Sequence, residues 1–327
     1  MKEIFGFDSI GNEIIKNFKC GKLHHCNLIN GQKGVGKAIF AYNMASIILS
    51  NGDVKRTCRL IESGGHTDLF ALDISTLDID GKENTSKKGE ISVKQARKVI
   101  ESIKLTPSIS NNKVLIVDSV DNVNVNGQNA LLKTLEEPPG NTYIFLICHN
   151  INKVINTIQS RSNIINIPGL SLEDWAKALF TNEETFDKNL TDEEIQDLYN
   201  LSNHSVGFAL EIIGGNAIDM YDKILDLILN KNVVEIQKFA NDIDNQDLFG
   251  LFVNFLDKIF QNLIEFSILE NDEQFLEKRK DIFKTLVKDR GMKKVSYSYD
   301  EYRRIVDDAV IYNLDRKQCI IDLLIST

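Results

Sequence analysis

The sequence predicts an α/β fold with a parallel, doubly wound sheet in its first half, followed by an all-α second half. Three observations predict this. Short apolar runs alternate with amphipathic helical stretches as far as Pro168. A glycine-rich loop joins the first apolar run to a helical pattern. Beyond Pro168-Gly169, apolar residues recur at helical spacing and no convincing strand follows.

Each element has its own local signal. Strands are predicted at 26–30, 68–74, 113–118, 143–148 and 163–167. Helices are predicted at 92–104, 128–137, 170–180 and 191–201, and a helical pattern with apolar positions from Ile39 to Ile48 follows the glycine loop. Ser92, Ser171, and Thr191 with Glu194 are expected to cap three of these helices. Pro138-Pro139 ends the helix 128–137. The polar stretch 78–89 is predicted to be a loop, and a long apolar helix is expected from about Asp247.

Composition limits the possible classes of protein. A chain of 327 residues with 43% hydrophobic residues is expected to form two or three domains. No apolar run approaches the roughly 20 residues that span a bilayer. The five cysteines are scattered and odd in number, which suits the reducing cytoplasm better than a disulfide framework. We therefore expect a cytoplasmic protein without membrane partners.

Charge is unevenly distributed along the chain. Residues 1–168 carry 20 Lys and Arg against 16 Asp and Glu, whereas residues 169–327 carry 18 against 31. The acidic second half is a poor surface for nucleic acid, so any contact with DNA is expected from the first half. Solvated acidic helices alone would also explain this asymmetry.

The glycine loop, residues 31–38, almost matches the phosphate-binding pattern G-x-x-x-x-G-K-[ST]. Gly31, Gly34 and Gly36 allow backbone N–H groups to surround phosphate oxygens at a helix N-terminus, and Lys37 would reach the phosphates. The last position should carry a hydroxyl that holds Mg²⁺, but it is Ala38. The loop therefore predicts either a nucleotide site without its metal ligand or a loop that is retained for structure.

Four ordered motifs resemble the AAA+ clamp-loader family, and within it the delta-prime type of subunit of bacterial DNA polymerase III. The strongest runs from Asn129 to Pro139 (N-A-L-L-K-T-L-E-E-P-P) and is followed by T-I-Q-S-R-S from Thr157 to Ser162. The others are the glycine loop, the C-R-L-I segment that starts at Cys58 and leads to G-G-H-T-D-L, and the Walker B strand that ends at Asp118. The resemblance covers about residues 5 to 168.

The resemblance implies three domains: an AAA+ P-loop α/β domain at 1–168, a helical lid at 169–230 and a helical collar at 231–327. It also implies that the site is degenerate. The residue after Asp118 should be a catalytic glutamate but is Ser119, and Phe208 stands where active relatives carry an arginine on the lid. Asp121 is expected to be structural. The isolated chain is therefore predicted to be inert in hydrolysis, although it could bind ATP or ADP.

Arg161 is the predicted catalytic residue, acting in trans. In the family that the chain resembles, the arginine of this motif enters the ATP site of the neighbouring subunit. A guanidinium suits this task because it stays charged and presents a fixed fork of donors to phosphate oxygens. The alternative is an arginine that forms a salt bridge on its own surface. Ser162 replaces the family's cysteine, a small change.

Two further predictions concern metal and DNA. Many relatives carry four zinc-binding cysteines just after the helix that follows the glycine loop, the last of them within the C-R-L-I match. Only Cys58 remains in this chain, so no zinc or other metal site is expected. His66 is expected to make a local hydrogen bond. Lys94, Arg97 and Lys98 can share one face of the helix 92–104 and contact DNA phosphates without regard to sequence, or they can form an ordinary solvated face.

The resemblance implies a subunit that assembles with gamma/tau and delta subunits to load the sliding clamp on primed DNA. The apolar helix of the collar would supply contacts between subunits, or its apolar residues would form the collar's own core. The first alternative function is an active ATPase of the gamma/tau type, and the second is a free-standing P-loop kinase or NTPase.

Overall fold

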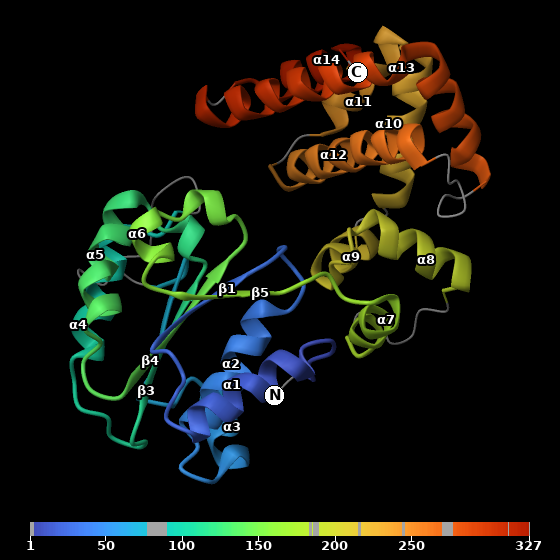
Figure 1. Cartoon of the computed structure of the whole chain (residues 1–327). Helices are drawn as coiled ribbons and strands as arrows, with labels where there is room; N and C mark the ends of the chain where they lie inside the picture. The colour runs from blue at the N-terminus through green and yellow to red at the C-terminus, as the bar shows by residue number, and fades with distance from the viewer. Residues whose placement is uncertain are drawn as a thin grey trace. The chain divides into compact units, whose positions relative to one another are not determined.

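The computed structural model describes residues 3–76, 90–182, 185, 190–214, 217–243, 246–269, 277–312 and 314–326. The chain forms two compact units, drawn in Figure 1. The first comprises residues 1–182 and 205–207, and the second comprises 183–204 and 208–327. The predicted loop 78–89 lies outside the described residues. The predicted division into domains at 1–168, 169–230 and 231–327 stays a prediction.

The first unit contains one parallel sheet of five strands in the order β2-β3-β4-β1-β5. The strands are β1 (Cys26–Asn30), β2 (Leu69–Asp73), β3 (Lys113–Asp118), β4 (Thr142–Cys148) and β5 (Asn163–Asn166). The central strands β1, β3 and β4 are buried on both faces, which explains why their sequences are apolar runs rather than alternating patterns. The predicted parallel sheet is confirmed.

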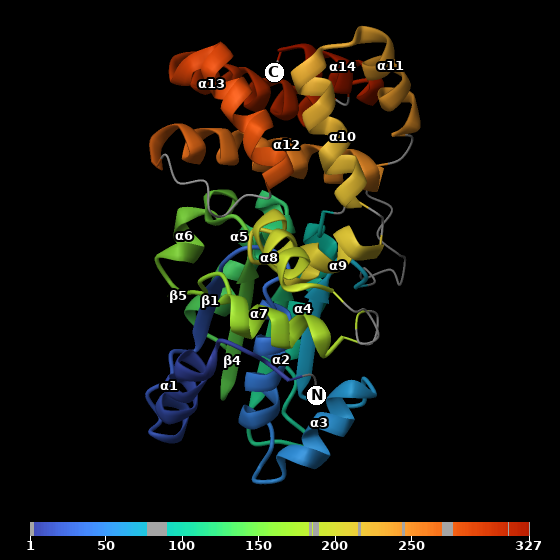
Figure 2. The ribbon, with the colours of Figure 1, turned by 90° about the vertical axis from the view of Figure 1, so that its right-hand side faces the viewer.

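Helices cover both faces of this sheet, as Figures 1 and 2 show: α1, α2 and α3 lie on one face, and α4, α5 and α6 on the other. Strands and helices alternate along the chain, so the sheet is doubly wound as predicted. The helices of this unit are α1 (Asp8–Lys19), α2 (Lys37–Ile48), α3 (Val54–Glu62), α4 (Val93–Ile103), α5 (Val125–Glu136), α6 (Asn156–Gln159) and α7 (Leu172–Phe180). Short 3₁₀ turns lie at Val120–Asn122 and Ile151–Lys153.

Helix starts follow the capping signals in the sequence. Ser92 caps α4 and forms a capping box with Gln95, and the Ser171 side chain caps α7. The start of α5 differs from the prediction. The helix was expected from Gln128, but Asn124 accepts the N–H of Gly127 and starts the helix at Val125, almost one turn earlier.

The second unit is helical throughout the residues that the structure describes, which confirms the predicted all-α second half. Its helices are α8 (Asp192–Leu201), α9 (Val206–Gly214), α10 (Ala217–Asn230), α11 (Val233–Asp242), α12 (Gln246–Leu269), α13 (Glu277–Tyr312) and α14 (Arg316–Ser326). Ser205 and the first two residues of α9, Val206 and Gly207, belong to the first unit. Thr191 and Glu194 form the predicted capping box at the start of α8.

The apolar stripe of α12 lies inside the second unit. Phe255 packs edge-on against Tyr221 of α10, and Phe260 packs against Tyr302 of α13, with ring centroids 5.4 and 5.2 Å apart. These contacts favour the second of the two alternatives for this helix, an internal core. The stripe's buried members are Phe252, Phe255, Leu256, Ile259, Phe260 and Leu263.

None of the helices in the described part of the chain combines the length and the apolar character that crossing a bilayer requires.

Candidate functional site

The carboxyl ends of β1, β4 and β3 lie side by side, and the glycine loop begins at this edge. Asn30 of β1 is level with Cys148 of β4, and Ile147 of β4 is level with Asp118 of β3. The N–H of Gly31 donates to the carbonyl oxygen of Cys148 at 3.2 Å, so the loop leaves the sheet in register. Parallel α/β sheets bind ligands at this edge. The structure thus brings the glycine loop, Asp118 and the end of β4 together.

Three glycines shape the loop. Gly34 and Gly36 have φ angles of +83° and +100°, a left-handed conformation that glycine adopts without strain. Gly36 is also the N-cap of α2, and the first N–H groups of that helix, together with its dipole, favour an anion at this end. Gly31 is restricted by space, because a Cβ there would lie 2.7 Å from the carbonyl oxygen of Ile167.

Lys37 is held over the loop by the loop's own backbone. Its ammonium group donates to the carbonyl oxygens of Gly31 and Gln32, both at 2.6 Å, and the residue is 3% exposed. Burial lowers the pKa of Lys37 to about 8, against the opposing charges of Cys148, Asp121 and Asp118. An ammonium has three donors, so this geometry leaves one N–H for a phosphate oxygen.

The groups that hold and use a magnesium ion are incomplete. The methyl group of Ala38 follows Lys37 and cannot ligate a metal. Burial raises the pKa of the Asp118 carboxyl; Lys37 opposes this shift, and Asp73 and Asp121 reinforce it. Among the described residues, no group of three or more His, Cys, Asp or Glu side chains is placed to bind a metal ion. The cradle fits a phosphate, whereas the metal ligands do not fit magnesium well.

Ser119 occupies the position where a catalytic glutamate would be needed. It is buried, and its hydroxyl oxygen has no hydrogen-bond partner among the described residues. A serine hydroxyl is too weak a base to activate water at neutral pH without a neighbouring base. The position therefore supplies no general base.

Asp121 does not substitute for the missing glutamate. Its two carboxylate oxygens accept the backbone N–H groups of His149 at 3.0 Å and Asn150 at 3.2 Å, so it fixes the turn after β4. These contacts support the predicted structural role of Asp121. Burial lowers the pKa of the His149 ring, and the charge of Lys37 adds to this effect against that of Asp121. The His149 Nδ1 atom is buried and has no partner among the described residues.

The segment Ser205–Gly207 contacts the glycine loop, and the sequence did not predict this contact. The N–H of Gly207 donates to the carbonyl oxygen of Gly34 at 2.9 Å, and the Ser205 hydroxyl donates to that of Lys33 at 2.8 Å. The only signal in the sequence was a small residue, Gly207, near the start of a helix. The next residue, Phe208, belongs to the second unit, where its ring centroid lies 6.0 Å from that of Phe255. Its aromatic side chain carries no charge that could bind a phosphate.

Arg161 follows α6 on the surface of the first unit. Its Nε donates to a carboxylate oxygen of Glu136 at 2.6 Å, and its Nη1 donates to the carbonyl oxygen of Thr157 at 3.1 Å. The salt bridge on the chain's own surface is therefore present, while the arginine side chain remains 38% exposed. Whether Arg161 also serves a neighbour's site stays a prediction.

Ser162 is well integrated in place of the family's cysteine. Its hydroxyl donates to the carbonyl oxygen of Ile158 at 2.8 Å and lies 3.1 Å from the Sγ atom of Cys26 in β1. The replacement keeps the turn that carries Arg161 attached to the sheet.

The predicted basic face lies on α4. Lys94 and Arg97 are exposed and Lys98 is partly exposed, whereas Ala96, Val99 and Ile103 are buried. The helix is thus amphipathic and presents three cations to solvent, as predicted. DNA contact by this face stays a prediction.

The C-R-L-I segment and its continuation have a structural role that depends on contacts between distant parts of the chain. Cys58 lies on α3, and the absence of zinc stays a prediction. His66 makes the expected local hydrogen bond, since its Nδ1 accepts the N–H of Asp68 at 3.3 Å. Asp68 was not predicted as important, but its carboxylate accepts three backbone N–H groups at 2.6–2.7 Å, from Ser108, Ile109 and Ser110.

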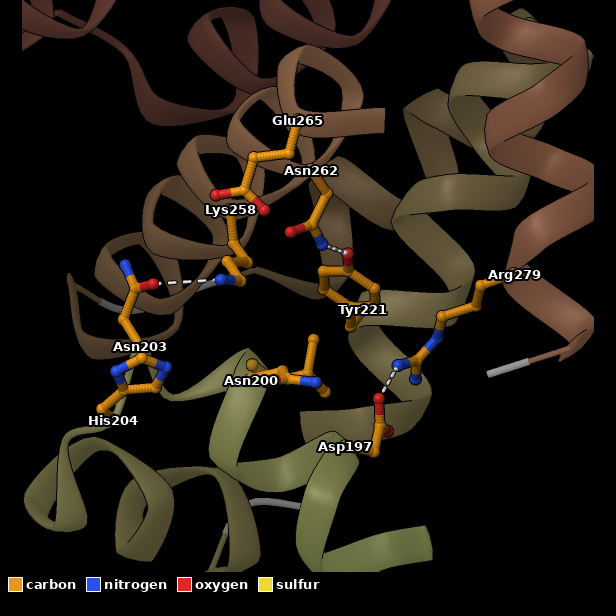
Figure 3. Close-up of a pocket in the computed structure, with 10 residues that line it drawn as sticks. Asp197, Asn200, Asn203, His204, Tyr221, Lys258, Asn262, Glu265 and Arg279 are labelled. Carbon is orange, nitrogen blue, oxygen red and sulfur yellow. Dashed lines mark hydrogen bonds and ion pairs between the residues drawn. The ribbon is translucent and has the colours of Figure 1, made fainter. Parts of the chain in front are cut away.

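The second unit contains a polar cavity of about 190 Å³ between α8, α10, α12 and α13 (Figure 3). Arg279 of α13 is paired with Asp197 of α8 and, at 2.7 Å, with Asp222 of α10, and it lies over the ring of Tyr221 at 4.7 Å. Lys258 donates to Asn203 at 3.0 Å. The cavity is lined by two cations, Arg279 and Lys258, and by two carboxylates, Asp197 and Glu265. We therefore interpret it as a polar contact region between these helices.

Comparison with known proteins identifies the family. The family model described as "DNA polymerase III, delta subunit" matches residues 8–171, half of the chain, and includes the glycine loop, Asp118 and Arg161. The chain belongs to this family. It is accordingly a clamp-loader subunit of DNA polymerase III, with a parallel α/β unit and a helical C-terminal part.

Individual relatives carry two kinds of name. The DNA polymerase III subunit gamma of Buchnera aphidicola subsp. Schizaphis graminum is 29% identical over 281 residues, which are 80% of this chain and 74% of that protein. The subunit delta′ of Pseudomonas aeruginosa is 34% identical over 167 residues, 47% of this chain and 48% of that protein. The match thus spans about half of the length of this delta′ subunit. Similarity alone does not separate the two types.

A solved structure with a similar chain length is the gamma subunit-related protein of Thermotoga maritima. Its TM-score is 0.42 at 13% identity, with 95% of this chain and 97% of that chain covered.

Proposed function

We propose that the chain is a delta-prime-type subunit that assembles with gamma/tau and delta subunits to load the sliding clamp on primed DNA. The observation that carries the proposal is the pair of positions next to the phosphate site. Ala38 offers no ligand to Mg²⁺ and the buried Ser119 offers no general base, while the loop around them keeps its shape. A gamma/tau-type ATPase needs both groups.

Adenine nucleotide binding without hydrolysis is compatible with this loop. The left-handed Gly34 and Gly36, the N-terminus of α2 and the remaining N–H of Lys37 all favour phosphate oxygens. The buried Nδ1 of His149 lies at the same edge of the sheet and lacks a partner among the described residues. In this proposal ATP or ADP is a bound ligand and not a substrate of this chain.

Arg161 is proposed to act on the nucleotide of a neighbouring subunit. Its guanidinium is partly exposed, and its charge persists at any physiological pH. An arginine that meets the transferring phosphoryl group stabilises the charge of the transition state, and such fingers contribute about 10³–10⁵-fold to rate in other nucleotide hydrolases. The chain would therefore contribute to catalysis only within the assembly.

The rest of the chain has supporting roles in this proposal. The exposed Lys94, Arg97 and Lys98 of α4 would contact the phosphates of primed DNA without reading its sequence. Residues 169–230 would form the lid and residues 231–327 the collar. The assembly, and this subunit with it, would be cytoplasmic.

The second candidate is an active ATPase of the gamma/tau type. The alignment with the Buchnera gamma subunit favours it, because that alignment extends over 80% of this chain, into the helical half. The chemistry of positions 38 and 119 opposes it. A free-standing P-loop kinase or NTPase is disfavoured because the family match includes Arg161, which such an enzyme would not use.

The test compares the isolated chain with the assembly. The isolated chain should not hydrolyse radiolabelled ATP, and turnover by the purified chain would exclude the inert-subunit proposal. In an assembly reconstituted with gamma/tau and delta subunits, Arg161→Ala should lower DNA-stimulated hydrolysis. The matched control is Arg56→Ala, which removes an exposed arginine of α3. If both variants match the wild type, Arg161 is not a finger.

A further inference from the structure

We propose that Glu136 is a positioning residue for Arg161: its carboxylate holds the guanidinium so that the Nη2 edge faces a phosphate of the neighbouring subunit. The inference rests on the proposed role of Arg161 in trans. Glu136 is the last residue of α5, within the L-E-E-P-P stretch, and Arg161 is 25 positions further along the chain. The 2.6 Å distance between the Glu136 Oε1 and Arg161 Nε atoms is that of a strong charge-assisted hydrogen bond.

Two of the three guanidinium nitrogens are held by the chain itself. Glu136 accepts from Nε, and Nη1 donates to the carbonyl oxygen of Thr157 at 3.1 Å. Because a guanidinium is planar, fixing two of its nitrogens fixes the plane and the direction of the third. Nη2 carries two N–H groups, and these can meet phosphate oxygens without breaking the pair with Glu136.

Two residues at the start of β1, His25 just before the strand and Cys26 within it, contact the residues next to Glu136 and Arg161. The Nε2 of His25 donates to the carbonyl oxygen of Leu135, directly before Glu136, at 2.8 Å. The Sγ of the next residue, Cys26, lies 3.1 Å from the hydroxyl oxygen of Ser162, directly after Arg161. The backbone on either side of the salt bridge is thus attached to the same part of the sheet.

This arrangement reduces the entropy that an exposed arginine loses when it engages a phosphate. A free arginine side chain samples many rotamers, and part of this freedom must be lost in the transition state. A finger that is already held in one orientation loses less at that moment. The contribution of Glu136 is limited, because both side chains are partly exposed, at 38% and 48%.

The expected effect is a lower kcat with an unchanged KM for ATP, because the phosphate contact matters most in the transition state. In the reconstituted assembly, Glu136→Ala should reduce the kcat of DNA-stimulated hydrolysis by about two- to fivefold, the range that an exposed ion pair allows. Glu136→Gln should retain most of the rate, since its amide oxygen still accepts from Nε. Its thermal unfolding midpoint, and that of Glu136→Ala, should match the wild type.

The matched control is Glu137→Ala, which removes the adjacent exposed carboxylate and should leave kcat unchanged. In an Arg161→Ala background, Glu136→Ala should have no further effect. If Arg161→Ala lowers the rate but Glu136→Ala equals or exceeds the wild type, Glu136 does not position the finger. If Arg161→Ala itself has no effect, the proposed role of Arg161 and this inference are both overturned.

Discussion

Gly34 and Gly207 meet backbone to backbone, with a hydrogen bond of 2.9 Å from the N–H of Gly207 to the carbonyl oxygen of Gly34. A Cβ on Gly207 would lie 2.8 Å from the Cα of Gly34, and a Cβ on Gly34 would lie 2.3 Å from the Ser205 hydroxyl oxygen. Each glycine therefore has a steric reason that is independent of nucleotide. The contact attaches the glycine loop to the first residues of α9.

Gly207→Ala should displace this contact. The new methyl group must push aside backbone atoms of the loop, which cannot rotate away as a flexible side chain could. We expect a loss of about 1–3 kcal/mol in the free energy of unfolding, the usual range for overpacking. Urea denaturation followed by circular dichroism measures it. Gly214→Ala is the control, because none of the described residues lies within 4 Å of a Cβ at this position of the same helix. An equal loss in both variants would contradict the steric argument.

Arg279→Met should strongly destabilise the second unit. The side chain is 4% exposed and pairs with Asp197 and Asp222, whose side chains are 11% and 30% exposed, so its removal takes away the buried cation that these two carboxylates share. Breaking a buried pair on one side costs about 3–5 kcal/mol. Chemical denaturation gives the value. The control is Lys223→Met, which breaks the exposed pair with Glu235 at 3.1 Å and should cost at most about 1 kcal/mol.

Asp68→Asn should remove part of the chain's sensitivity to acid. Burial alone would raise the pKa of the Asp68 carboxyl, but the N–H groups of Ser108, Ser110 and Ile109 hold that pKa below its usual value. A lowered folded-state pKa gives stability that is fully present above the ordinary Asp value of about 3.9 and is lost as pH falls through the folded-state pKa.

The measurement is the unfolding free energy of wild type and Asp68→Asn between pH 3 and pH 7. At pH 7 the variant should be less stable by about 1–3 kcal/mol, because an amide cannot accept the three N–H groups as a carboxylate does. The difference between the two proteins should shrink toward pH 3. A constant difference across this range would show that Asp68 does not act through its charge.

Nucleotide affinity should fall at alkaline pH if Lys37 binds phosphate. Burial lowers the pKa of Lys37 to about 8, so its protonated fraction declines about tenfold between pH 7 and pH 9. Since a phosphate favours the ammonium form, the Kd for ADP should rise by about tenfold over this range. Isothermal titration calorimetry measures it. Lys33→Met, at an exposed lysine of the same loop, should retain the pH dependence, and Lys37→Met should abolish binding.

Much of the fold could be predicted because its signals are local. The apolar runs of β1, β3 and β4 identify strands buried on both faces, and Ser92, Ser171 and Thr191 cap helices through residues three positions away. The start of α5 was missed because Asn124 is a weak signal until its side chain is seen to accept the N–H of Gly127. The glycine loop and the alanine in place of a hydroxyl residue at position 38 could likewise be recognised, because both depend only on which residues stand at given positions.

The family, the doubly wound sheet, the helical second half and the residue types at positions 38 and 119 could be derived from the amino-acid sequence, because they depend on neighbouring residues or on residue chemistry. Which distant groups meet depends on the tertiary structure. In the folded chain, Glu136 forms a salt bridge with Arg161, and the N–H of Gly207 donates to Gly34. The amides of the loop 108–110 donate to Asp68. The tertiary structure also places the apolar stripe of α12 inside its own unit. Spacing reveals which face of a helix is apolar, but what covers that face depends on packing between segments far apart in the chain.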